Sequence, residues 1–251
     1  MLGALVVLVA AAAPPAAAQE PARCMGRDVT IQGTDGSDSL EGTEGDDVIH
    51  GGGGSDRIEA LGGDDWICTG PGGGTLLGGR GHDRIRGGDG FDEMFTGAGD
   101  DHVEGRGAAD ALLTGPGADR VAGGPGEDDV QGGVGPDRLL GQGGDDRFQG
   151  GGGAEQYFGR DRHDDFIDGG RGRDTLEAYE TANDEEGVRR VDLGSGVATG
   201  SGRDRLRRIE NAEVTDEGGV ALGDGRANVL RALGKVHGRG GDDVLASAER
   251  A

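Results

Sequence analysis

The sequence predicts an all-β fold built from short stacked repeats, and three observations support this prediction. From Gly33 to Ile167 the chain repeats every nine residues, fifteen times without a break. The eighth position of every copy is a large, mainly apolar residue, and the first six positions are rich in glycine. Units of nine residues cannot bury an apolar face alone, so successive copies must stack on one another.

Each copy consists of a turn of six residues followed by a strand of three. The copies GGRGHDRIR (78–86), GGDGFDEMF (87–95) and TGAGDDHVE (96–104) show the pattern. An apolar residue between two polar ones is typical of a strand with one buried face. The glycines permit positive φ or a close approach of main chains in the turn.

The eighth positions form the predicted core. After one additional residue, Asp168, a sixteenth copy occupies residues 169–177. The core residues are then Leu40, Ile49, Ile58, Ile67, Leu76, Ile85, Met94, Val103, Leu112, Val121, Val130, Leu139, Phe148, Tyr157, Phe166 and Leu176. With aromatic residues at only 3%, and 58 Gly and 7 Pro among 251 residues, this core is thin for the length of the chain. Without the period, such a composition would indicate disorder.

The sixth position carries an aspartate in fourteen of the sixteen copies, with Gly74 and Glu155 as the exceptions. Stacking places these like charges in register, in a chain whose net charge is already −23. Their mutual repulsion requires a cation among them. Carboxylates together with the carbonyl oxygens that glycine leaves accessible make an all-oxygen site, which suits calcium best. A zinc site is not expected, because the chain has two cysteines and its five histidines form no cluster.

The copies match the motif G-G-x-G-x-D-x-U-x, where U is large and apolar, and the chain therefore resembles the RTX, or hemolysin-type, calcium-binding proteins. The match is close over residues 33–177 and looser over 223–246. The resemblance implies a right-handed parallel β-roll with two nonapeptides per coil and calcium between the turns of copies i and i+2. The ligands it implies are Asp38, Asp47, Asp56, Asp65, Asp83, Asp92, Asp101, Asp110, Asp119, Asp128, Asp137, Asp146, Asp164, Asp174 and, in the C-terminal part, Asp243.

With eight turns on each side of the roll, there are seven gaps between adjacent turns per side. The repeats can therefore hold at most about 14 calcium ions, and we expect about ten good sites. We expect weaker calcium binding in the two gaps beside Gly74, which lacks a carboxylate. The longer side chain of Glu155 should distort the two gaps beside it. Arg162 replaces a turn glycine and weakens copy fifteen.

Residues 1–18 have an apolar run that closes on Ala-x-Ala, as in a secretory signal peptide with cleavage after Ala18. The run is too short to span a bilayer. We expect a secreted, bacterial protein with an N-terminal cap over residues 19–32. An exported chain permits a disulfide, and we expect Cys24–Cys68 to clip the cap against the open end of the roll.

The repeat stops over residues 178–222. Val188–Leu193 and Val197–Thr199, on either side of a Gly-Ser-Gly segment, predict a β-hairpin insertion. Residues 223–251 resume as a degenerate roll that caps the stack. The six residues 232–237 between its two copies fall three short of a repeat.

No catalytic motif is present, and the paired carboxylates repeat too evenly to form one active site. The strong negative charge argues against a nucleic-acid partner. We therefore expect a non-catalytic calcium-binding structural or binding module. Two alternatives stay open: a targeting or secretion module separated from an RTX enzyme or toxin, and a roll whose outward residues bind ice, a glycan or a cell-surface partner.

Overall fold

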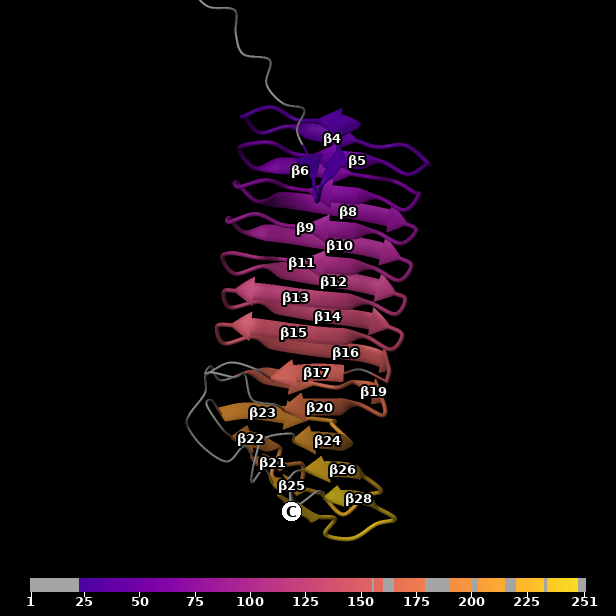
Figure 1. Ribbon diagram of the computed structural model, residues 1–251, viewed down its shortest axis with the longest axis vertical. Helices are drawn as coiled ribbons and strands as arrows, with labels where there is room; N and C mark the ends of the chain where they lie inside the picture. Colours follow the sequence, from indigo (N-terminus) through magenta and orange to yellow (C-terminus); the bar gives the residue numbers. More distant parts are fainter. Residues whose placement is uncertain are drawn as a thin grey trace, which may run out of the picture.

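The computed structural model describes residues 23–154, 156–159, 165–178, 190–199, 203–214, 220–232 and 234–247, and within them all regular structure is β. Short strands stack along one long axis, from the N-terminal rungs at one end to the C-terminal rungs at the other (Figure 1). The signal peptide predicted over residues 1–18 lies outside this part of the chain. No described segment forms a helix with the length and apolarity needed to cross a membrane.

Two sheets face each other across the stack, and we call them the first and the second sheet. The first has 14 strands: β4 (Ser39–Glu41), β6 (Asp56–Glu59), β8 (Gly74–Arg80), β10 (Asp92–Ala98), β12 (Ala111–Pro116), β14 (Asp129–Val134), β16 (Arg147–Gly153), β18 (Phe166–Asp168), β23 (Arg203–Arg207), β22 (Val197–Thr199), β21 (Arg190–Asp192), β25 (Val220–Leu222) and β27 (Lys235–His237), with β19 (Arg171–Gly172) beside β16. The second has 12: β3 (Ile31–Gln32), β5 (Val48–His50), β7 (Trp66–Cys68), β9 (Arg84–Arg86), β11 (His102–Glu104), β13 (Arg120–Pro125), β15 (Arg138–Gly143), β17 (Gln156–Gly159), β20 (Thr175–Ala178), β24 (Asn211–Val214), β26 (Val229–Ala232) and β28 (Val244–Ser247).

The register of the strands gives two nonapeptides per coil. Met94 pairs with Leu76 on one side and Leu112 on the other, and both lie 18 residues away in sequence. Alternate copies therefore contribute strands to alternate sheets, and all the pairs from β3 to β17 are parallel. The predicted parallel β-roll is confirmed.

The core between the sheets is the predicted ladder of eighth positions. Ile49, Ile58 and Leu76 are fully buried, and the ladder continues buried to Tyr157 and Leu176. Copy fifteen is different. The core residue there is Ile167, which is 1% exposed and pairs with Phe148, whereas the prediction of Phe166 is wrong. The one-residue insertion therefore precedes this strand instead of following it.

Glycine is required in the turns because adjacent turns stack in direct contact. Gly99 has a φ of +141°, and a Cβ placed on it would overlap the carbonyl oxygen of Gly81 in the turn above. Its own N–H donates to the carbonyl of Pro116 in the turn below, at 2.9 Å. Any side chain at this position would separate the turns.

The C-terminal interruption stays within the stack. β21 and β22 form the predicted antiparallel hairpin, and β23 joins it to β18, so the hairpin extends the first sheet. In the second sheet, β24 follows β20 directly. Strands β23 and β24 both lie inside the segment 178–222, where the sequence predicts no strand of the roll apart from the hairpin. The last coil is shorter, because Leu230 pairs with Leu245 and Ala221 with Val236, each 15 residues apart.

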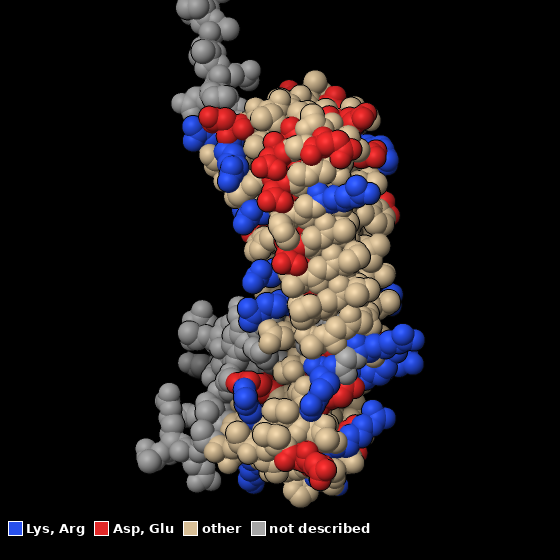
Figure 2. All heavy atoms as spheres, turned by 90° about the vertical axis from the view of Figure 1, so that its right-hand side faces the viewer, with Lys and Arg blue, Asp and Glu red and all other residues tan. Residues whose placement is uncertain are grey.

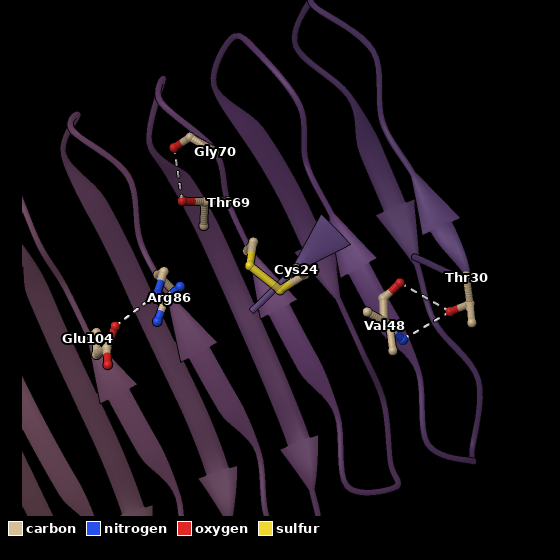
Figure 3. The surroundings of a disulfide bond; sticks show 8 residues. Cys24, Thr30, Val48, Thr69, Gly70, Arg86 and Glu104 are labelled. Carbon is tan, nitrogen blue, oxygen red and sulfur yellow. Dashed lines mark hydrogen bonds and ion pairs between the residues drawn. A yellow bond between two sulfur atoms is a disulfide. The ribbon is translucent and has the colours of Figure 1, made fainter. Parts of the chain in front are cut away.

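An N-terminal hairpin of β1 (Arg23–Cys24) and β2 (Arg27–Asp28) packs beside the second sheet. The predicted disulfide is present: Cys24 joins Cys68 at the end of β7, with Cα atoms 5.7 Å apart (Figure 3). The guanidinium of Arg27 lies 4.1 Å from the ring centroid of Trp66, and that of Arg84 lies 4.8 Å from it. The hairpin is thus fastened to the outer face of the sheet, not across the open end of the roll as expected.

The register of copy fifteen can be tested with two substitutions. We expect Ile167→Ala to lower the free energy of unfolding by about 2–5 kcal/mol, because it removes a buried side chain from the core ladder. Phe166→Ala should cost clearly less, since Phe166 is only half-buried on the outer side. Urea unfolding of both variants in calcium measures the difference, and a larger loss for Phe166→Ala would restore the register predicted from the sequence.

Candidate metal sites

The sixth-position aspartates lie inside the roll, at the inner side of each turn where it enters the following strand. Of the fifteen predicted ligands, twelve are buried: Asp47, Asp56, Asp65, Asp83, Asp92, Asp101, Asp110, Asp119, Asp128, Asp137, Asp146 and Asp174. On the face drawn in Figure 2, acidic side chains gather near the N-terminal end, and the middle of the stack is largely uncharged. Much of the negative charge of the repeats is therefore inside the molecule.

For most ladder carboxylates, one oxygen accepts a hydrogen bond from the main chain of the preceding coil. Asp92 is an exception, because its Oδ2 accepts the N–H of Gly88 in its own turn. The N–H of Asp83 donates to Oδ1 of Asp101 at 2.9 Å, and the N–H of Asp101 donates to Oδ1 of Asp119 at the same distance. On the other side of the roll, the main-chain N–H of Asp110 donates to Oδ1 of Asp128 at 2.7 Å. These bonds hold the carboxylates that accept them in one orientation from coil to coil.

The second carboxylate oxygen has no such partner. In eight aspartates it is buried without a hydrogen bond: Oδ2 of Asp56, Asp65, Asp83, Asp110, Asp119, Asp128 and Asp137, and Oδ1 of Asp92. A buried polar atom without a partner costs about 1–3 kcal/mol, and more when it is charged. Asp101 is different because it accepts the hydroxyl of Thr96. A row of eight orphaned oxygens is best explained by a ligand that the protein itself does not supply.

The turns leave room for the carboxylate, and main-chain carbonyl oxygens lie close to the adjacent turn. A Cβ on Gly87, at the first position of its copy, would lie 2.6 Å from Oδ2 of Asp92. A Cβ on Gly97 would overlap the carbonyl oxygen of Gly79, which points along the stack at the next turn. The turns thus contain both carboxylate and main-chain carbonyl oxygens, the donor types that a hard cation prefers.

Burial opposes ionisation of the ladder in the metal-free fold. Desolvation raises the pKa of Asp83, Asp110 and Asp137 to about 7, and that of Asp65, Asp119 and Asp128 to about 6, although the N–H bond from the preceding coil lowers each pKa. For Asp83, the adjacent carboxylates of Asp101 and Asp65 raise it further. A bound divalent cation would reverse this preference and hold the carboxylates ionised.

Within the described residues, no three His, Cys, Asp or Glu side chains come together as one metal cluster. A cation in the stack would thus be held by carboxylates from adjacent turns together with main-chain carbonyls. This donor chemistry fits calcium and does not fit a metal that needs thiolate or imidazole ligands.

The ends of the ladder differ from the prediction. Asp38 and Asp243 occupy the terminal turns and are half-buried. Asp164 lies outside the described residues, and Asp165 takes the ladder position: it is 5% exposed and accepts the N–H of Asp146 at 3.0 Å. The prediction for copy fifteen is corrected accordingly, by the same one-residue shift that places Ile167 in the core.

Two further acidic residues in the ladder were missed. Asp204 accepts the N–H of Asp165 at 3.3 Å, and Glu210 accepts that of Asp174 at 3.0 Å. A signal for the first is present, since GRDRL (202–206) repeats the end of the nonapeptide. Glu210 precedes Asn-Ala-Glu, which has no large apolar residue at the core position, so the sequence pattern does not mark it.

A family model for the RTX calcium-binding nonapeptide repeat matches the chain in overlapping segments at residues 32–67, 69–103, 77–112, 87–121, 104–139, 131–161 and 161–176. The chain belongs to the RTX calcium-binding repeat family. A search of curated proteins found no match. Repeats of this family bind calcium, and the buried carboxylate ladder of this RTX chain fits that role.

Replacing one ladder carboxylate should damage two gaps. We expect Asp128→Asn to remove up to two calcium ions and to weaken the flanking sites about tenfold, because a charged ligand contributes about 1.5–3 kcal/mol. The amide oxygen can still accept the N–H of Asp110. Equilibrium dialysis with calcium measures the loss. The control is Asp129→Asn, whose carboxylate lies outside the ladder at 3.8 Å from Arg147; equal damage from both variants would contradict the ligand assignment.

The raised pKa values give opposite pH dependences with and without calcium. In chelator, stability should fall as the pH rises from about 4 to 7, because the fold binds more protons than the unfolded chain in this range. In calcium, protons compete with the ion, so the calcium midpoint should increase as the pH falls below about 7. Circular dichroism at two pH values tests both signs, and a calcium midpoint that is independent of pH would exclude the buried carboxylates as ligands.

Proposed function

We propose that this chain is a secreted calcium-binding β-roll whose folding is driven by several calcium ions between its stacked turns, and that it serves as a non-catalytic structural or binding module. The observation that carries the proposal is the row of buried ladder carboxylates with one oxygen left without a partner. A fold that buries so many like charges needs counter-charges to be stable near neutral pH.

The thermodynamic effect of the ions is large compared with ordinary protein stability. An ion present at 100 times its dissociation constant stabilises the fold by about 2.7 kcal/mol. With about ten ions, the total would exceed the stability of about 5–15 kcal/mol that is usual for a domain. The apolar ladder alone gives each coil only two core side chains. The folded roll should therefore be stable only when calcium is bound.

The ligand gaps are not equivalent. The gap between Gly74 and Asp92 lacks one carboxylate, because glycine replaces the aspartate. Glu155, the other exception at the sixth position, lies outside the described residues. At Asp101 the hydroxyl of Thr96 already occupies one carboxylate oxygen. We expect these gaps to bind calcium more weakly than those beside Asp110 and Asp128, and the ions to number about ten in total.

Export supports the same function. The apolar leader with its Ala-x-Ala end and the Cys24–Cys68 disulfide both suit an extracellular protein. Extracellular modules bind calcium with dissociation constants of about 0.1–1 mM, whereas cytosolic calcium is far lower. The chain would therefore stay unfolded inside the cell and fold after it leaves. The even repetition of the acidic residues along the stack supports a role without catalysis.

A calcium titration followed by circular dichroism tests the proposal. In chelator at neutral pH we expect the purified chain to lack most of its strand signal, and rising calcium should restore it cooperatively, because neighbouring coils stabilise one another. Magnesium at the same concentration is the control, since it requires a smaller and more rigid octahedral site. A strand signal that is complete in chelator would refute the coupling of folding to calcium.

A further inference from the structure

A hollow of about 350 Å³ lies between the N-terminal hairpin and the turns that follow β7, β9 and β11. We call it the N-terminal hollow. It is lined by Arg23 and Met25 from the hairpin, His50 and Arg86 from the second sheet, and Arg106 from a turn. The disulfide reaches it at Cys68, and the turn segments 70–71 and 87–89 complete the lining. Its volume lies within the range of about 300–1,000 Å³ that is usual for small-molecule sites.

The lining is basic, in contrast to the strongly acidic chain. It holds three arginines and one histidine, and Asp89 is its only acidic residue. Arg86 donates from Nε to Glu104 at 2.8 Å, which anchors the side chain and leaves the two terminal nitrogens for another acceptor (Figure 3). Arg106 makes no ion pair or side-chain hydrogen bond with any described residue. Arg23 contacts Asp28 at 3.4 Å on the surface.

The lining holds one buried polar atom without a partner and one arginine at a position that is usually glycine. Nδ1 of His50 is buried and has no hydrogen-bond partner among the described residues. Arg106 has a φ of +86°, the conformation found at the second position of most copies, where glycine is the usual residue; an L-residue adopts it at a cost of about 1–2 kcal/mol. Leu61 and Gln142 share this strain, but Arg106 alone of the three brings a charge to the hollow.

The break in the carboxylate ladder lies beside this hollow. Gly70 and Pro71 belong to the copy whose sixth residue is Gly74, so the adjacent turn lacks its buried aspartate. The negative potential that the ladder creates elsewhere is therefore reduced where the arginines gather. Arginine is well suited to such a position, because its planar fork binds carboxylate, sulfate and phosphate groups through paired hydrogen bonds.

We propose that the N-terminal hollow binds an oxyanion group of a small polar molecule, with Arg86 and Arg106 as its principal ligands and Arg23 and His50 at its walls. The ligand class is an acidic sugar or another small organic acid or ester with one carboxylate, sulfate or phosphate group. Because β1 forms one wall, the hollow depends on the Cys24–Cys68 disulfide, and its reduction should weaken binding.

Isothermal titration calorimetry of the calcium-loaded chain tests this proposal with two probes, sodium sulfate and sodium D-glucuronate. Sulfate replaces phosphate because calcium phosphate precipitates. Binding of sulfate alone would identify a tetrahedral oxyanion, and binding of glucuronate alone a carboxylate on a sugar. We expect Arg106→Gln and Arg86→Gln each to weaken binding at least about tenfold, which corresponds to about 1.4 kcal/mol.

The matched control is Arg120→Gln, an exposed arginine of the same sheet that does not line the hollow. It should leave binding unchanged, and circular dichroism in calcium should show that all three variants fold. The proposal is overturned if neither probe binds the folded chain, or if both hollow variants bind as well as the control. Because every titration uses chain already folded in calcium, a failure here is distinct from a failure of calcium-coupled folding.

Discussion

The repulsion between stacked carboxylates is the constraint on which the rest of this structure depends. Parallel pairing sets neighbouring coils about 4.8 Å apart, so every sixth-position aspartate lies above another of the same charge. At this spacing two charges repel by about 3 kcal/mol even with an effective dielectric constant of about 20. Protonation relieves the repulsion at acidic pH, and a divalent cation relieves it near neutrality. The same aspartates are therefore the basis of the proposed coupling between folding and calcium.

The glycines follow from this arrangement more than from turn propensity alone. At the first position of a copy, the carboxylate occupies the space that a side chain would need, as at Gly87 beside Asp92. At the second and fourth positions, adjacent main chains approach so closely that carbonyl oxygens fill the place of a Cβ, as at Gly97 and Gly99. The apolar ladder holds the two sheets together, and the buried carboxylates line the turns that connect them.

Departures from the repeat give this roll its individual features. The turn that lacks a ladder carboxylate, Arg106 in place of a turn glycine and the disulfide-bound hairpin all border the N-terminal hollow. A perfectly regular stack presents the same surface on every coil and cannot single out one ligand position. The irregular coils present a surface that occurs once in the stack. The hollow is therefore a better candidate for specific recognition than the repeated turns.

The sequence by itself determined the β-roll, its core ladder and most of its buried aspartate ladder, because a nine-residue period translates directly into stacking and register. Only the tertiary structure decided the places where the period fails. Asp164-Asp165 and Phe166-Ile167 offer two equivalent alignments in sequence, and the pairing of Ile167 with Phe148 in the adjacent coil selects one. Asp204 and Glu210 join the ladder for the same reason: a strand distant in sequence finds its register from the coil on which it packs.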